Sequence, residues 1–368
     1  MKSIFICTHI NDAHAMLVQV ALEAAGHRVV RWIGADCPTR QTQSLRIIPS
    51  PSIVFKTDKG EYSSNEFDVI WWRRLTPAFL PRNVHPGDAE AANREWEIMY
   101  ESLSNVFKKE AMWVNSFEGR RLGNDKIRQL ACARDVGLKV PDTLVSNNID
   151  DIRSFVANQS SNVVHKMFAP TSWANEERYA RARTTIVTSD HLLHEASLKL
   201  CPGIFQARVS KKVEIRATFM GNKCNAVEIE PRDEEGGVCD WRSIPAEHWR
   251  MQPTTLPDDI HRKCLQIMDR LKIVFGCFDL ILTTEGEYVF LEVNQMGQFL
   301  WVEESCHEMK LLSDFCNFII AGTTQNGHSS NIKTSMADVS LSERYAELKA
   351  LESDAHVNIK PYLLDNAY

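Results

Sequence analysis

Apolar and polar residues alternate along the N-terminal part of the chain with two different periods. An apolar run at residues 2–10, an amphipathic stretch at 12–27 and an apolar run at 28–34 predict strand, helix and strand. Gly26 lies where such a helix would end. Three further elements continue this α/β lobe: a hairpin at 52–64, a buried strand at 67–74 and a long helix at 89–111.

Gly, Asn and Asp residues between 115 and 125 indicate a boundary between lobes. The following lobe has predicted helices at 125–138, 150–159 and 190–200, and predicted strands at 140–146, 162–168, 183–189 and 203–209. A third region has predicted hairpins at 212–231 and 277–294, and predicted helices at 258–273 and 310–322. We expect the first of these hairpins to turn at Gly221 and Asn222, residues 323–336 to form a linker, and 340–355 to form an exposed helix.

The second hairpin combines an apolar face with three polar side chains at one end. If Glu285 and Gly286 form its loop, Asp279 lies directly opposite Glu292, and Asn294 shares their face. The residues expected on the opposite, core face are Phe278, Leu280, Leu282, Val289, Leu291 and Val293. The hairpin therefore presents two carboxylates and an amide together on a rigid apolar backing.

Two carboxylates that face each other across strands repel, so a compensating charge is expected beside them. A hard divalent cation such as Mg²⁺ would fit, because it prefers oxygen ligands and is often held by one or two carboxylates. The alternative is a solvated acidic end of an edge hairpin. The positions of Asp279, Glu292 and Asn294 in the sequence do not by themselves decide between the two interpretations.

Composition restricts the classes of protein that remain. The chain has 368 residues, 44% of them hydrophobic, which suits two or three packed lobes of a soluble protein. It has no apolar run of membrane-spanning length, and its N-terminus becomes polar too early for a signal peptide, so we expect a cytosolic protein without membrane association. A net charge of −6 argues against nucleic-acid binding as the main activity.

The ten cysteines are scattered, without a CxxC pair or a Cys/His cluster. They are expected to be reduced core thiols rather than zinc ligands or disulfide partners. The common signatures of phosphate loops, dinucleotide folds, zinc proteases and serine hydrolases are absent from the sequence. Any bound nucleotide must then be held by side chains and strands.

Several charged residues have two open interpretations. Lys166 interrupts an apolar strand, where it would either meet an anion such as a phosphate or extend from a sheet edge into water. Lys126, taken alone, has the character of an exposed helix lysine. Glu214 and Arg216 share one face of a strand, which is either functional or simply solvated.

Arg73 and Arg74 follow a buried strand at the end of the first lobe. They would either bind a carboxylate or form ion pairs between lobes, and the structural role is favoured slightly. The segment DWR, which ends at Arg242, is too short to indicate a function by itself.

Taken in order, the two spaced lysines, the KxEIR hairpin and the Asp strand followed by ExN resemble the ATP-grasp superfamily. The stretches VIWWRRLTP and FLEVNQMGQFLWVEE resemble, more narrowly, the microviridin or graspetide type of peptide ligase, the macrocyclases. This resemblance implies an α/β and α+β chain with an N-terminal pre-ATP-grasp lobe at 1–120 and an ATP-grasp domain at 121–322. The latter would divide into a central lobe at about 121–205 and a C-terminal lobe at about 206–322, followed by a linker and helical tail at 323–368.

The resemblance also implies roles for individual residues, with ATP and Mg²⁺ as cofactors. Lys126 and Lys166 match phosphate-contacting lysines, and Arg216 matches a basic residue that faces the phosphates and the acceptor carboxylate. The residues that match the adenine hinge are Gln206, Ala207, Arg208 and Val209, and Glu214 matches a residue near the ribose. Asp279, Glu292 and Asn294 match the magnesium ligands, and Arg242 loosely matches an arginine that steadies an acyl phosphate.

The implied activity is ATP-dependent ligation of a carboxylate to a hydroxyl or amine through an acyl phosphate, with a ribosomal precursor peptide as substrate. Two alternatives stay open: a ligase of free amino acids or small metabolites, similar to glutathione synthetase or RimK, and an ATP-binding regulatory module without catalysis. The C-terminal tail would either pack on the core or mediate a homodimer. Residues 169–182, at the position of a lid that is glycine-rich in many relatives, have no glycine, which suggests a lid ordered by substrate.

Overall fold

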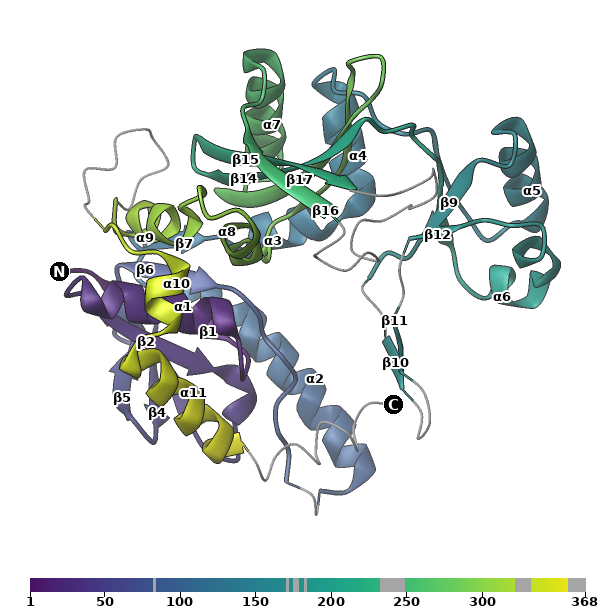
Figure 1. Cartoon of the computed structure of the whole chain (residues 1–368). Coiled ribbons are helices and arrows are strands. Elements are labelled where there is room, and N and C mark those ends of the chain that lie inside the picture. The colour runs from purple at the N-terminus through teal and green to yellow at the C-terminus, as the bar shows by residue number, and fades with distance from the viewer. Residues whose placement is uncertain are drawn as a thin grey trace.

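The computed structural model describes residues 1–81, 84–169, 172–174, 179–181, 184–231, 249–321 and 332–356 (Figure 1). In the N-terminal lobe, four parallel strands form a sheet in the order β2-β1-β6-β7. These strands are β1 (Ser3–Thr8), β2 (Arg28–Ile33), β6 (Val69–Trp72) and β7 (Met112–Val114). Helix α1 (Ala13–Ala24) connects the first two, as the period of its apolar residues predicts.

A second, antiparallel sheet of β3 (Thr42–Arg46), β4 (Ser52–Thr57) and β5 (Gly60–Ser63) completes this lobe. The long predicted helix is present as α2 (Pro86–Ser102), but it ends earlier than expected. A 3-10 turn at Leu103–Asn105 follows it and directs Val106 and Phe107 into the aromatic core of the lobe. Burial of these side chains decides where the helix ends.

In the central lobe, four antiparallel strands are ordered β12-β9-β13-β8. They are β8 (Thr143–Ser146), β9 (Val163–Lys166), β12 (Thr185–Ile186) and β13 (Gly203–Ala207), covered by α5 (Ile149–Asn158). The helix predicted at 190–200 is divided into a 3-10 turn (His191–Leu193) and α6 (Glu195–Leu200), because His194 has non-helical φ and ψ of −85° and 58°. A small hairpin of β10 (Ser172–Ala174) and β11 (Tyr179–Arg181) extends away from this sheet (Figure 1).

The C-terminal lobe contains a five-stranded antiparallel sheet in the order β16-β15-β14-β17-β18. Its strands are β14 (Val213–Met220), β15 (Lys223–Pro231), β16 (Trp249–Thr254), β17 (Phe275–Leu282) and β18 (Tyr288–Asn294). Helices α4 (Lys126–Asp135) and α7 (Asp258–Arg270) pack on one face and bury its apolar residues. Helix α3 (Phe117–Asn124) leads into this region from the N-terminal lobe.

The opposite face of this sheet has two halves. Met220, Phe275 and Cys277 pack into a core shared with α1 and Trp71 of the N-terminal lobe. Farther along the same face lie Arg216 and Asp279, because side chains on a strand alternate between faces. The shared core therefore holds the N-terminal lobe beside the polar half of the sheet.

The β17–β18 hairpin differs from the prediction in its loop. Thr283 N donates to Glu287 O at 2.9 Å, so the loop has three residues rather than the predicted two, with Gly286 at a φ of +83°. The register then shifts beside Asp279, because Leu280 pairs with Phe290 and leaves Leu291 as an extra residue. As a result Phe290, and not Leu291, enters the core.

The C-terminal part adds α8 (Leu300–Ser305), α9 (Leu311–Ala321), α10 (Met336–Ser340) and α11 (Glu343–His356). The prediction that the last helix is exposed was wrong for one of its faces. Leu348 is 3% exposed and joins the core beside α1, and Arg344 pairs with Glu23 at 3.0 Å. Residues 323–331 of the predicted linker lie outside the described residues.

Among the helices that the structure describes, none is long and apolar enough to cross a membrane. The nine cysteines in the described residues are all free thiols, and seven of them are buried. The prediction of reduced core thiols is confirmed for these seven. Cys201 is exposed and Cys224 is partly buried, and Cys239 lies outside the described residues.

Candidate functional site

The predicted acidic group is assembled at one end of β17 and β18. Asp279 lies directly opposite Glu292, and the Asn294 amide contacts Asp279 Oδ2 at 3.4 Å and Glu292 Oε1 at 3.3 Å. The prediction missed both the third loop residue and the bulge at Leu291. Each shifts the pairing by one residue, in opposite directions, so the predicted pairing of Asp279 with Glu292 is kept. The three side chains therefore share a face as the sequence predicted.

Arg216 provides the charge that the two carboxylates require. It stands opposite Asp279 on the neighbouring strand β14, and its Nη1 donates to Asp279 Oδ1 at 2.7 Å. Its Nη2 donates to the carbonyl of Gln298 at 3.0 Å, and the residue is only 5% exposed. The guanidinium is therefore held in one orientation beside the acidic group.

Lys126 approaches the same group from the start of α4. Its Nζ lies 3.7 Å from Glu292 Oε2 and donates to Met167 O at 3.1 Å. The interpretation of Lys126 as an exposed helix lysine was wrong, because its side chain is only 27% exposed. Asp125 caps the helix by accepting from Arg128 N, which sets the position from which the lysine extends.

The chemistry of the donors fits a hard cation. Two carboxylates and a side-chain amide offer oxygen ligands, which Mg²⁺ prefers, and the remaining positions of such an ion are commonly taken by water and phosphate oxygens. Asn294 Nδ2 donates to both carboxylates here, and half a turn of its amide would present Oδ1 to a bound cation. Within the described part of the chain, no group of three or more His, Cys, Asp or Glu residues could hold a metal, so the set consists of two carboxylates and one amide.

Lys166 lies at the end of β9, next to the Met167 carbonyl that Lys126 contacts. Strand β9 has β12 on one side and β13 on the other, and it is therefore not an edge strand. The interpretation of Lys166 as a lysine extending from a sheet edge is wrong. The structure brings the two predicted phosphate lysines to the same junction of the central and C-terminal lobes.

The predicted hinge segment leaves β13 and enters the C-terminal lobe. Gln206 is 2% exposed, and its Nε2 donates to Thr143 Oγ1 at 3.0 Å. Backbone N–H groups of Ala207 and Arg208 donate to Asp142 O and Asn162 O, each at 2.9 Å. These bonds fix the path of the segment between the two lobes, from which Val209 continues toward β14.

Glu214 lies close to the start of β14, and its Oε1 accepts a hydrogen bond from Lys211 Nζ at 2.6 Å. Its side chain is 12% exposed, so the interpretation of this strand face as simply solvated was wrong for both Glu214 and Arg216. Arg242 lies outside the described residues, and its role stays a prediction.

Arg73 has the structural role that the sequence favoured, with a different partner. Its Nε pairs with Asp12 of the same lobe at 2.6 Å, rather than with a carboxylate of another lobe. Its Nη1 donates across the lobe junction to Met296 O at 3.0 Å. Burial raises the pKa of Asp12, but the charge and hydrogen bond of Arg73 outweigh this effect and hold the pKa well below its usual range.

Sequence reasoning missed three polar residues that support the site. Asn115 is 2% exposed and bonds both Phe275 O and Gln295 O at 2.8 Å. Gln129 Nε2 donates to Val293 O at 3.0 Å, and His14 Nε2 accepts from Phe299 N and Leu300 N at 3.1 Å. None of these three has a local sequence signal, whereas Asp12, the partner of Arg73, has one as an N-cap residue before an apolar helix.

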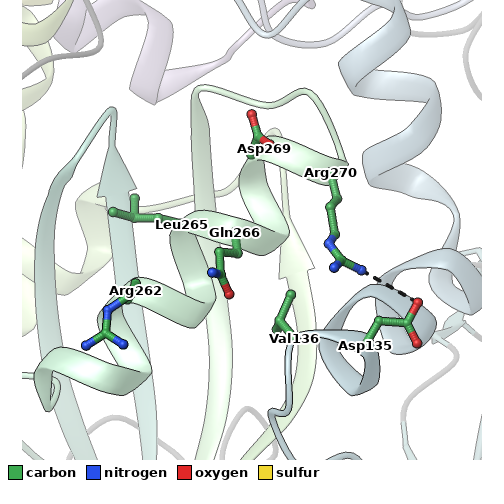
Figure 2. A pocket seen from close by; sticks show the side chains of 7 residues that line it. All are labelled: Asp135, Val136, Arg262, Leu265, Gln266, Asp269 and Arg270. Carbon is green, nitrogen blue, oxygen red and sulfur yellow. Dashed lines mark ion pairs between the residues drawn. The ribbon is translucent and has the colours of Figure 1, made fainter.

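A separate depression of about 570 Å³ lies between α4 and α7 (Figure 2). Figure 2 shows Gln266 and Arg270 of α7 directed toward Val136 and Asp135 at the end of α4. Arg270 Nη1 lies 3.6 Å from Asp135 Oδ2. Both helices cover the face of the sheet opposite to Arg216 and Asp279, so this depression is not part of the candidate site.

Two α+β lobes that meet at paired lysines and an acidic β-hairpin, preceded by a parallel α/β lobe, define the ATP-grasp fold. Solved structures agree. The macrocyclase MdnC from Microcystis aeruginosa MRC, bound with precursor peptide MdnA, is 25% identical over 87% of this chain and 99% of its own, with a TM-score of 0.77. A RiPP-associated ATP-grasp ligase from Chryseobacterium gregarium, in complex with ADP and a leader and core peptide, is 25% identical over 88% of this chain and 98% of its own, with a TM-score of 0.79.

D-alanine–D-alanine ligase from Bacillus anthracis, complexed with ATP, shares the fold at 11% identity, 87% and 96% coverage and a TM-score of 0.54. No protein-family model matches the sequence, and no match is found among curated proteins. The chain thus has the ATP-grasp fold and resembles, within it, ligases that modify ribosomal peptides.

Proposed function

We propose that this protein is an ADP-forming ATP-grasp ligase that joins a side-chain carboxylate of a ribosomal precursor peptide to a hydroxyl or amine. The observation that carries the proposal is the meeting of Asp279, Glu292 and Asn294 with Arg216 and Lys126 at one lobe junction. Two of the similar solved structures are peptide-modifying ligases with peptide bound, which supports a peptide as the substrate here.

In the proposed reaction an oxygen of the peptide carboxylate attacks the γ-phosphorus of ATP, and the bond from that phosphorus to the oxygen of ADP breaks. The hydroxyl or amine then attacks the carbonyl carbon of the acyl phosphate. The bond between that carbon and the phosphate oxygen breaks, phosphate leaves, and the attacking hydroxyl or amine loses a proton. The protein contributes position and charge rather than a covalent partner.

In this proposal Lys126 and Lys166 hold phosphate oxygens, and Arg216 holds the carboxylate against the γ-phosphate. Asp279, Glu292 and Asn294 would hold Mg²⁺, which when bound neutralises charge on the phosphates. Near the hinge, Gln206 Oε1 is buried and has no hydrogen-bond partner among the described residues, so it suits an amino group such as that of adenine. Ala207, Arg208, Val209 and Glu214 would complete the nucleotide site, with Arg242 as a further arginine near the acyl phosphate.

The free thiols fit the reducing cytosol, where we place the reaction. A homodimer is a further prediction, and light scattering after gel filtration measures it directly. Neither point affects the assignment of the site.

The test is phosphate release from Mg-ATP by the purified protein, with and without any short peptide found to be encoded next to its gene, and with intact mass recorded on that peptide. We expect peptide-stimulated release and the loss of one water per bond formed. Turnover with free amino acids but not with the peptide would assign the protein to small-molecule ligation. Binding of ATP without turnover under either condition would favour a regulatory module.

A matched substitution tests the metal group. Asp279→Asn keeps the shape of the side chain and removes one carboxylate, so turnover should fall by about 100-fold or more. Undiminished ATP consumption by this variant would refute the assignment of Asp279.

A further inference from the structure

The connection from β18 to α8 has backbone groups that are bonded mainly by side chains from other elements. Gln295 O accepts from Asn115, Met296 O and Gly297 O accept from Arg73, and Gln298 O accepts from Arg216. Four successive carbonyls, directly after Asn294, are thus held from three separate parts of the chain. We call this segment, residues 295–298, the clamp loop.

The clamp loop is tightly packed on its inner side. A Cβ at Gly297 would lie 2.4 Å from Cys277 Sγ, and Gly297 N donates to Asn294 O at 3.1 Å. The loop therefore follows one path, and a shift of its carbonyls would move the end of β18. Through Gln298 O the loop also accepts one of the hydrogen bonds that orient the Arg216 guanidinium.

Arg73, in the N-terminal lobe, contacts two carbonyls of this loop. It is 1% exposed, and its Nη1 lies 3.0 Å from Met296 O and 3.3 Å from Gly297 O. Its Nε is held by Asp12 at 2.6 Å, and Asp12 also accepts from Thr8 Oγ1 at 2.5 Å. The guanidinium therefore reaches a carboxylate and two carbonyls at once, which a lysine ammonium at the same position would not.

His14 contacts the two residues that follow the clamp loop. Its Nε2 accepts from the backbone N–H groups of Phe299 and Leu300, each at 3.1 Å. Asp12 caps the helix that carries His14. The N-terminal lobe thus holds the loop's carbonyls with an arginine and the following N–H groups with a histidine.

We propose that Arg73, held by Asp12, is a positioning residue: through the clamp loop it orients Arg216, and so sets the rate of the chemical step. The inference rests on the proposed function for the role of Arg216. Arg73 would not touch ATP or peptide itself. The N-terminal lobe would in this way contribute to catalysis in the other lobes without supplying a reacting group.

A double-mutant cycle tests the proposal on the full-length protein. Steady-state phosphate release from Mg-ATP, with the peptide that stimulates it in the wild type, is measured for wild type, Arg73→Lys, Arg216→Lys and the double variant. We expect Arg73→Lys to lower kcat about tenfold, with the KM for ATP changed less than about twofold. Because Arg73 acts through Arg216, the double variant should be no slower than Arg216→Lys alone, within about threefold.

If the loss of kcat in the double variant equals the product of the losses in the two single variants, the proposal is overturned. Such a result would mean that Arg73 affects the rate independently of Arg216. The matched control is Arg28→Lys, because Arg28 is an arginine of the same lobe that pairs with Glu66 at 2.7 Å on the surface. This control should leave kcat and KM unchanged. A tenfold loss in it as well would show a nonspecific response of the lobe.

Amide hydrogen exchange supplies a readout that needs no peptide turnover. In Arg73→Lys we expect exchange of the amides at 297–300 to accelerate about tenfold relative to wild type, without faster exchange in β3–β5. Asp12→Asn, which retains a helix-capping side chain, should act in the same direction if Arg73→Lys folds poorly. Unchanged exchange at 297–300 in both variants would overturn the clamp.

The two readouts also separate the inference from the proposed function. A wild-type protein that releases no phosphate with the peptide would refute the function, whereas the exchange result would still decide whether Arg73 holds the loop. Faster exchange combined with independent effects on kcat would reduce Arg73 to a structural residue.

Discussion

The contact of His14 with the start of α8 predicts a measurable dependence of stability on pH. The pKa of His14 is lowered to about 3, chiefly because the ring is buried and next because the positive charge of Arg73 is nearby. Its Nε2 accepts two backbone hydrogen bonds, which only the neutral ring with a free Nε2 lone pair permits. Its ring also packs edge-on against Phe299, with centroids 5.4 Å apart.

The sign follows from proton binding in the two states. Between pH 6.5 and about 3 the unfolded chain binds a proton at His14 and the folded chain does not, so lowering the pH favours the unfolded state. The shift from 6.5 to about 3 corresponds to at most about 5 kcal/mol. A pH of about 5 lies about 1.5 pH units below the pKa of His14 in the unfolded chain. About 2 kcal/mol of folding stability should therefore be lost at this pH relative to neutral pH.

His14→Gln isolates this contribution, because glutamine offers an acceptor oxygen and does not titrate. The free energy of unfolding of each protein is measured by urea denaturation at about pH 7.5 and about pH 5, and the difference between the two proteins is compared. The advantage of wild type over the variant should shrink by about 2 kcal/mol at the lower pH.

His27 and His165 also have lowered pKa values, chiefly through burial, but they are present in both proteins and cancel. An equal difference at both pH values would refute the reasoning. So would a His14 imidazole signal that titrates near pH 6.5 in the folded protein, as followed by NMR.

Of three further predictions, two concern single contacts and one concerns residues 169–182. Gly297→Ala should cost about 1–3 kcal/mol, because its Cβ would lie 2.4 Å from Cys277 Sγ, whereas Gly87→Ala meets only ordinary contacts and should be nearly neutral in the same thermal melts. Glu303→Gln should cost about 1–3 kcal/mol, since its buried carboxylate accepts from the backbone of both α9 and α10; an unchanged melting temperature would contradict this. Limited proteolysis at 169–182 should slow with Mg-ATP and peptide, and equal cleavage would argue against an ordered lid.

Much of the candidate site could be predicted because it depends on the alternation of side chains along strands. The face shared by Asp279, Glu292 and Asn294 follows from this period of two. The details of the loop did not follow, because Glu285 and Gly286 also suit a two-residue turn. The bulge at Leu291 restores the predicted pairing, and it arises where Phe290 rather than Leu291 fits the core.

The surroundings of the charged residues could not be predicted from their neighbours in sequence. Lys126 taken alone resembled a surface lysine, yet its Nζ lies between Glu292 and the Met167 carbonyl. Arg73 contacts Met296, which is 223 residues away in the chain. Such pairs form only when separately folded elements pack against each other.

The sequence by itself determined the types of the main elements and which polar residues share a strand face, because both follow from local backbone geometry. Tertiary structure alone decided which charges meet: Arg216 with Asp279, Lys126 with Glu292, and Arg73 with Asp12 and the clamp loop. The physical reason is that a buried charge requires a partner at hydrogen-bonding distance, and that distance is set by the packing of whole lobes.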